Sequence, residues 1–267
     1  MGKRSLAVPF TFVALLTLAP KFSGAEGATS KIAFAADVGG AGDIFVVNSD
    51  GTGLANVTNS PISEGGPVWS PDGGSIACSS ENGIWTMNAD GSNAVNLING
   101  GTANASPSWS PDGTKISFFS TRDHGWSDIF VMERDGSDPI NLTPTEGHGG
   151  NSPAWSPDGQ SIAFHGFAEI VDIFVMASDG SDLRNLTNNT ARDSRPEWSP
   201  DGNLIAFHST RDGGDCGSNF FVMNADGSQV RQLTTSPHCG SAPSWSPDGT
   251  RILFTSNRWG SASRSSL

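Results

Sequence analysis

Short apolar stretches separated by turn residues run along most of the chain, and this pattern predicts β-strands. One kind has an Ile-Ala-Phe-type core and occurs at residues 31–34, 75–78, 115–118, 161–164, 204–207 and 251–254. A second kind, typically Ile-Phe-Val, follows at 43–46, 83–86, 128–131, 172–175 and 219–222. Apolar runs this short, bounded by Gly, Pro, Asp and Asn, are typical of strands. No segment has a helical period long enough to compete.

The motif Trp-Ser-Pro-Asp-Gly precedes the first kind of stretch and recurs every 40 to 47 residues. Its copies begin at Trp69, Trp109, Trp155, Trp198 and Trp245. Pro presets the second position of a turn and Gly accepts a left-handed backbone, so Ser-Pro-Asp-Gly predicts a tight reversal. An Asp-Gly turn follows each second stretch and leads into a short closing segment such as Asn-Leu-Thr. Each unit therefore predicts four short strands.

One four-stranded sheet cannot bury both of its faces, but copies stacked around an axis can. We therefore expect an all-β protein, a β-propeller of four-stranded antiparallel blades, with the Trp residues packed between blades. Six stretches of the first kind but only five of the second are present. This count favours six blade positions with an incomplete closing blade. The alternative is a five-bladed ring in which the strand ending at Trp245 completes the first blade.

Residues 1–25 differ from the rest of the chain and predict a secretory signal peptide. Lys3 and Arg4 precede an apolar run from residue 6 to residue 20, and Ser23-Gly24-Ala25 offers small residues for cleavage. The run is shorter than the ~20 residues that a membrane-spanning helix needs. We therefore expect residues 26–267 to form a single propeller domain in the periplasm or outside the cell, with no membrane insertion after cleavage.

Charge and cysteine content narrow the possible partners and the redox state. The formal net charge is −12, which argues against nucleic acid because phosphate binding needs a basic patch. Three cysteines in an oxidising compartment suggest one pair and one free thiol. Cys216 and Cys239 are expected in neighbouring loops of one face, and we predict a disulfide between them. Cys78 replaces a strand Phe, so we expect a buried free thiol there.

The repeat resembles the TolB-type propeller family, whose WD-like repeats also precede the catalytic domain of prolyl-oligopeptidase relatives. The resemblance rests on Trp-Ser-Pro-Asp-Gly, Ile-Ala-Phe, Asp-Ile-Phe-Val-Met, Asn-Ala-Asp-Gly-Ser and Asn-Leu-Thr, over about residues 30 to 256. It implies the propeller fold and an exported location. TolB itself carries an α/β domain before its propeller, which we do not expect here, so we expect a relative and not TolB itself. No Gly-x-Ser-x-Gly nucleophile motif of the peptidases is present.

Candidate binding residues lie in the longer connections, which should share one face of the propeller. They are His124, Trp126, His148, Arg192, Arg195, Arg211 and His238. His165 and His208 occupy equivalent positions in adjacent units and are the candidate metal ligands. No catalytic triad can be argued from spacing, and no close pair such as His-x-His occurs.

These features predict a non-enzymatic exported scaffold that binds a protein or peptide partner, as the resemblance implies. The alternative is a metal-dependent saccharide lyase or hydrolase that uses the loop-face histidines. We expect no cofactor, although carboxylate and carbonyl oxygens around a central channel would suit a Ca²⁺ ion. An unclosed ring would leave strand edges free, which would allow dimerisation through the open blade.

Overall fold

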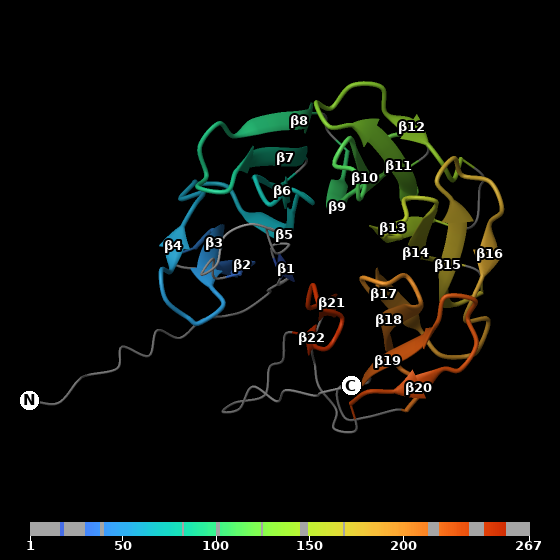
Figure 1. The fold of residues 1–267 in the computed structure, drawn as a ribbon. Coiled ribbons are helices and arrows are strands. Elements are labelled where there is room, and N and C mark those ends of the chain that lie inside the picture. Colours follow the sequence, from blue (N-terminus) through green and yellow to red (C-terminus); the bar gives the residue numbers. More distant parts are fainter. Residues whose placement is uncertain are drawn as a thin grey trace, which may run out of the picture.

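In the part of the chain that it describes, the computed structural model contains β-strands and no helix, and the strands form sheets around a common centre (Figure 1). It describes residues 17–18, 30–37, 40–81, 83–99, 102–123, 125–144, 149–167, 169–212, 219–234 and 243–254. The all-β prediction is confirmed. Within these residues, no helix is long and apolar enough to cross a membrane.

Five sheets have four strands each, in sequence order from one edge of the sheet to the other. The first contains β1 (Thr17–Leu18), β2 (Lys31–Asp37), β3 (Gly42–Asn48) and β4 (Ala55–Asn56). The second contains β5 (Glu64–Trp69), β6 (Ser75–Ser80), β7 (Gly83–Asn88) and β8 (Val95–Asn99). The third contains β9 (Asn104–Trp109), β10 (Lys115–Ser120), β11 (Asp128–Glu133) and β12 (Ile140–Asn141). The fourth contains β13 (Gly150–Trp155), β14 (Ser161–Phe167), β15 (Val171–Ala177) and β16 (Arg184–Asn185). The fifth contains β17 (Asp193–Trp198), β18 (Leu204–Ser209), β19 (Asn219–Asn224) and β20 (Arg231–Gln232).

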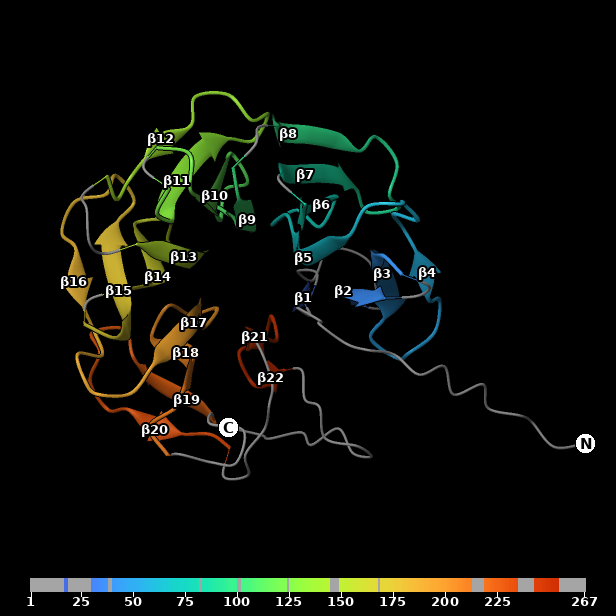
Figure 2. The same ribbon diagram turned by 180° about the vertical axis from the view of Figure 1, so that it is seen from behind.

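These five antiparallel sheets are full propeller blades, as many as the five-bladed alternative requires. The strand ending at Trp245 does not complete the first blade, because β1 occupies that position by pairing with β2. Trp245 instead ends β21 (Ser244–Trp245), which pairs with β22 (Ile252–Leu253) in a separate two-stranded sheet. This sheet lies between β17 and β1, where a sixth blade would stand (Figure 2). The described residues thus provide five full blades and two strands at the sixth position.

The hydrophobic core lies between neighbouring blades. Each cluster joins residues from two sheets, as where Ala33 and Ile44 of the first blade pack with Trp69 and Ile76 of the second. The same pairing recurs around the ring, and it includes the two-stranded sheet, whose Trp245 packs against Ala206 and Val222 of the fifth blade. Cys78 is a free, fully buried thiol in the first cluster. The predicted core role of the Trp residues and the buried state of Cys78 are confirmed.

The Ser-Pro-Asp-Gly segments form the expected tight turns. In the third blade, Ser110 Oγ donates to Asp112 Oδ1 at 2.6 Å, and the Thr114 amide donates to the same oxygen at 3.0 Å. Gly113 has a left-handed φ of +70°, which glycine adopts without steric strain. These hydrogen bonds hold the pKa of Asp112 below its usual value. The turn aspartates are therefore committed to local backbone.

Residues 17–18 of the predicted leader form β1, so that segment completes the first blade in this structure. The remaining leader residues lie outside the described part of the chain. Leader cleavage therefore stays a prediction, as does the boundary of the propeller domain at residue 26.

Candidate functional site

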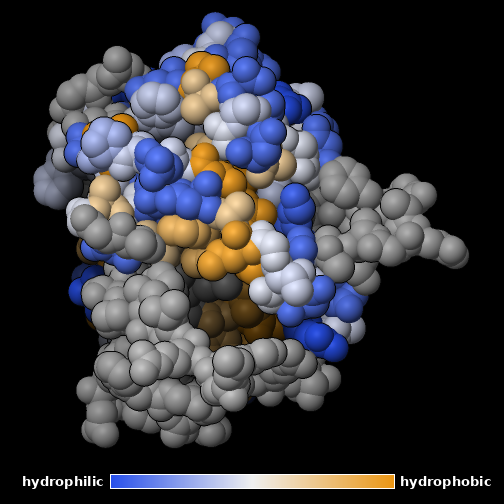
Figure 3. Space-filling model, turned by 90° about the vertical axis from the view of Figure 1, so that its left-hand side faces the viewer, coloured by the Kyte–Doolittle hydropathy of each residue, from blue (hydrophilic) through white to orange (hydrophobic). Residues whose placement is uncertain are grey.

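A cavity of about 1200 Å³ occupies the centre of the ring. Its walls are the innermost strands of the blades, chiefly β5, β9, β13 and β17, together with residues of β21. Strands β5, β9, β13 and β17 each form the inner edge of their sheet, and no described strand pairs with that edge. The cavity is therefore bordered by backbone N–H and C=O groups as well as by side chains. On the side of the molecule that carries the first blade, apolar residues form a band that runs down into a hollow (Figure 3).

A β-bulge recurs in every full inner strand that carries the Trp motif. A Pro stands two residues before the Trp of each of these strands. The residue before that Pro has a left-handed backbone at Gly66, Ser106, Ser152 and Arg195, with φ values of 59°, 54°, 50° and 55°. Strand register shifts at the same points. A residue before Pro rarely adopts this conformation, and three of the four carry a side chain. All four line the cavity, so the bulge places one residue per blade on its wall.

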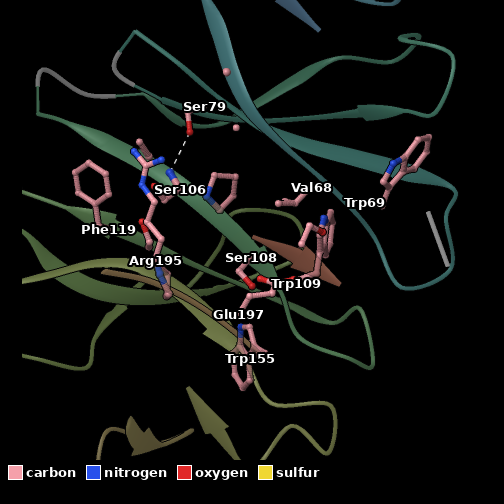
Figure 4. A pocket seen from close by; sticks show the side chains of 18 of the residues that line it. Val68, Trp69, Ser79, Ser106, Ser108, Trp109, Phe119, Trp155, Arg195 and Glu197 are labelled. Carbon is pink, nitrogen blue, oxygen red and sulfur yellow. Dashed lines mark hydrogen bonds between the residues drawn. The ribbon is translucent and has the colours of Figure 1, made fainter. Parts of the chain in front are cut away.

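The bulge is held by a side chain from the preceding blade at two of these positions. The Ser106 amide donates to Ser79 Oγ at 3.0 Å (Figure 4). The Arg195 amide donates to His165 Nδ1 at 3.3 Å. Ser79 and His165 occupy the same place in their strands, directly after the Cys or Phe of the Ile-Ala-Phe stretch. This place in the repeat therefore supports the bulge of the next blade.

His165 is neutral in this setting. Desolvation lowers its pKa to about 4, and the positive charges of Arg195 and Arg192 act in the same direction. Because Nδ1 accepts the Arg195 amide, the ring carries its proton on Nε2. His165 lines the cavity, and no described residue accepts a hydrogen bond from Nε2. The ring thus offers one N–H donor to whatever enters.

Arg195 and Glu197 bring two ionisable groups to the cavity from β17. The Arg195 side chain is exposed to the cavity, and no described residue forms an ion pair or hydrogen bond with its guanidinium. Desolvation raises the pKa of Glu197 to about 8, so its carboxyl is largely protonated at neutral pH. Figure 4 shows Arg195 on the same side of the cavity as Phe119, Ser79 and Ser106, away from the indole of Trp69.

Acidic residues line another part of the cavity. Asp37 belongs to the first blade, and Glu64 and Glu81 belong to the second. Glu64 accepts a hydrogen bond from Ser60 Oγ at 2.5 Å through Oε1, while the buried Oε2 has no partner among the described atoms. Desolvation raises the pKa of Glu64. Asp37, Glu64 and Glu81 thus lie on other blades than Arg195, and no ion pair among the described residues joins them to it.

The predicted loop-face residues do not converge on one site in the described part of the chain. Trp126 is 71% exposed, and Arg192 is exposed directly before β17. Arg195 is not in a loop as expected: it lies on β17 and faces the cavity, because the strand begins at Asp193. His124, His148 and His238 lie outside the described residues, as do Cys216 and Cys239 of the predicted disulfide.

Arg211 is committed to the interior of its own blade. Its guanidinium donates to the fully buried carboxylate of Asp193 at 2.8 Å and to Ser209 Oγ at 2.9 Å. The same group lies over the rings of Phe207 and Phe221, 5.4 and 5.0 Å from their centroids. These contacts use both its charge and its planar face. The structure therefore places Arg211 as a structural residue of the fifth blade.

Comparison with known protein families shows to which family the chain belongs. The family model described as "TolB beta propeller domain" matches residues 79–165 and 144–216, which together span more than half of the chain. The chain belongs to the TolB beta-propeller family. No curated protein matches the chain by sequence.

Solved structures of TolB proteins are similar to this TolB-family propeller. A putative TolB from Agrobacterium tumefaciens is 27% identical, with a TM-score of 0.73, covering 82% of this chain and 79% of that chain. TolB from Acinetobacter baumannii is 17% identical, with a TM-score of 0.69, covering 90% of this chain and 73% of that one. An oligogalacturonate lyase solved with manganese has a TM-score of 0.62 at 15% identity, covering 92% and 77% respectively. At that identity the lyase shares the fold alone.

The described residues of this TolB-family chain do not fit a metal centre of the kind the lyase comparison suggests. Among them, no three His, Cys, Asp or Glu side chains gather closely enough to hold an ion. Arg195 contributes to the lowered pKa of both His165 and His208, so a fixed positive charge stands near both candidate ligands. That charge would oppose a bound cation. The Ca²⁺ prediction for the channel stays untested.

Glu197 is a cavity residue that the sequence analysis did not single out, and Arg195, a candidate there, was expected in a loop and not on the cavity wall. A signal was present in the repeat itself. The two positions are small or apolar in the other copies, with Gly66, Ser106, Ser152 and Ala242 at the first, and Val68, Ser108, Ala154 and Ser244 at the second. The fourth copy, which ends the inner strand of the fifth blade at Trp198, alone has charged residues at both. Aligning the copies at the residues before each Trp, and not only at the Trp motif, would have identified β17.

Proposed function

We propose that this TolB-family propeller binds a protein or peptide partner through its central cavity. The observation that carries the proposal is the cavity of about 1200 Å³ bordered by the inner strands, whose inner edges pair with no other described strand. Such edges can hydrogen-bond to an extended polypeptide. The polar side chains of Ser106, Asn151 and Ser152 also line the cavity and can bond to peptide groups.

The charge distribution supports a polypeptide more than the other classes of ligand. A net charge of −12 opposes nucleic acid. A saccharide site commonly offers exposed aromatic rings, whereas all five Trp residues of the motif pack between blades. Trp69, Trp109 and Trp245 are only 6–7% exposed, and Trp155 and Trp198 are half-buried. The predicted leader at residues 1–25 and the family relationship favour action outside the cytoplasm, in the periplasm or after secretion.

Filling the cavity tests this proposal. Ser108→Trp places an indole on the cavity wall of β9, and Val95→Trp places the same group on the 53% exposed outer strand β8. We expect immobilised wild type and Val95→Trp to capture the same partner from an envelope extract, and Ser108→Trp to lose it. Thermal melts establish that all three proteins fold. Equal capture by a folded Ser108→Trp variant would place the partner site elsewhere.

A further inference from the structure

The fifth blade differs from the others at the cavity wall. Every other copy of the repeat has Gly, Ser or Ala at the bulge position, and Arg195 alone adds a long charged side chain there. The left-handed backbone before Pro disfavours any residue with a Cβ. A bulky residue at such a position gives no evident gain in packing, because the Arg195 side chain is exposed to the cavity. This departure from the repeat points to a ligand.

The guanidinium of Arg195 is available for binding. The ion pairs of the described residues are Lys115–Glu133, Arg134–Asp72 and Arg211–Asp193, and none of them involves Arg195. Arg211, sixteen residues further on, shows what a committed arginine looks like in the same blade, with a buried carboxylate and two aromatic rings around it. Arg195 has neither. In a chain of net charge −12, an unpaired arginine inside a cavity is not explained by solubility.

A second donor stands beside Arg195. His165 accepts the Arg195 amide through Nδ1 at 3.3 Å, which leaves its Nε2–H as a donor at the cavity wall. The positive charge of Arg195 also lowers the pKa of His165 and of His208, so the guanidinium lies near both rings. Glu197, two residues along the same strand, is kept largely neutral by desolvation at pH 7. It therefore leaves the charge of Arg195 uncompensated.

We propose that Arg195 and His165 form a carboxylate-binding subsite in the central cavity, which holds an acidic side chain or the C-terminus of a bound peptide. An arginine fork can donate two parallel hydrogen bonds to a carboxylate, and such charge-assisted bonds are stronger than neutral ones. The subsite rests on the proposed function, since it names the feature of the peptide that the cavity recognises. The free inner edges of the strands suit the peptide backbone on either side of the acid.

Two matched peptide pools test the subsite, and a third separates the two sources of the carboxylate. The matched pools are fluorescein-labelled random nonapeptides: one carries Glu at the central position and a free C-terminus, and the other carries Gln and a C-terminal amide. The third carries Gln and a free C-terminus; tight binding of this pool would assign the carboxylate to the C-terminus, and weak binding would assign it to the side chain. We expect fluorescence anisotropy to show at least about tenfold tighter binding of the acidic pool to the wild-type protein. Arg195→Gln should abolish this preference while leaving the weaker binding of the amidated pool unchanged. Arg195→Lys should restore part of the preference.

Arg231→Gln is the matched control, because Arg231 is exposed on the outer strand β20 and its loss changes net charge equally. An unchanged preference in Arg195→Gln, or the same loss in Arg231→Gln, would overturn the subsite and leave peptide binding intact. Failure of both pools to bind would instead count against the proposed function. Trigalacturonate supplies the same carboxylate on a sugar. If it bound more tightly than the acidic peptides, again through Arg195, the peptide assignment would be wrong.

Discussion

Arg195 and Arg211 both belong to the fifth blade, but of the two only Arg211 has a described partner for its guanidinium. Arg195 and Arg211 were both predicted to bind a partner from a loop face. The structure places Arg195 on β17 with its guanidinium open to the cavity, and it places Arg211 against the buried Asp193. The difference depends on where a strand begins and on which side chains of the blade lie beneath, and spacing in the sequence does not contain that information.

The structural role of Arg211 predicts a loss of stability on truncation. In Arg211→Ala, the Asp193 carboxylate stays fully buried with only Asn189 Nδ2 as a described hydrogen-bond donor. Removing one partner of a buried ion pair typically costs about 3–5 kcal/mol, and we expect the low end because Arg211 is 25% exposed. Urea denaturation measures the change.

Arg192→Ala provides the comparison for that measurement, because Arg192 is exposed and water surrounds its charged group. We expect it to change the free energy of unfolding by less than about 0.5 kcal/mol. The two variants could instead be equally stable, with partner capture lost only in Arg211→Ala. That result would show that Arg211 acts in partner binding and not in the stability of the blade.

At the scale of the element, the repeat made the strands and turns predictable. Each Asp-Gly turn expected from the sequence is present, and its glycine has a left-handed φ. What the pattern does not contain is that most of these turns also touch the preceding blade. A Cβ on Gly136 would lie 2.7 Å from the carbonyl oxygen of Leu97, and the equivalent distance from Gly180 to Leu142 is 2.9 Å. The turn thus acts as a spacer between blades.

A pair of equivalent glycines separates backbone conformation from blade contact. Gly51 and Gly91 both have φ of +85°, but a Cβ on Gly51 would meet nothing within 4 Å, whereas one on Gly91 would lie 1.9 Å from the carbonyl oxygen of Val57. We expect Gly51→Ala to cost about 1–2 kcal/mol for the left-handed backbone. Gly91→Ala should cost roughly 2 kcal/mol more, because a blade must move. Chemical denaturation checks both, and equal losses would show that the turn does not set blade spacing.

At the scale of the whole molecule, the sequence predicted the propeller but not how its ring is completed. Repetition of the Trp motif fixes the blade, and the inter-blade clusters follow from the apolar face of each strand. The sixth position has only β21 and β22 among the described residues. The open space around Gly51 fits this arrangement, because the equivalent glycines of later blades lie against the outer strand of the blade before them or against the residue that follows that strand.

The candidate site also belongs to this scale, because the cavity is made by the ring and not by any one unit. The sequence favours histidines and arginines of the loops as binding residues, whereas in the structure the strands place Arg195, His165 and Glu197 around the central space. Arg195 and Glu197 lie two residues apart on β17, and His165 comes from β14 of the preceding blade. The packing of these two blades around the axis brings the three residues to one wall.

Photo-cross-linking of the captured partner tests the central claim most directly. A benzoylphenylalanine is placed at Asn151 on the cavity wall, at Val95 on the outer strand, and at Trp126 on the exposed connection. We predict that the partner forms adducts from position 151 and none from positions 95 or 126. Adducts from position 126 or 95 alone would contradict binding in the central cavity.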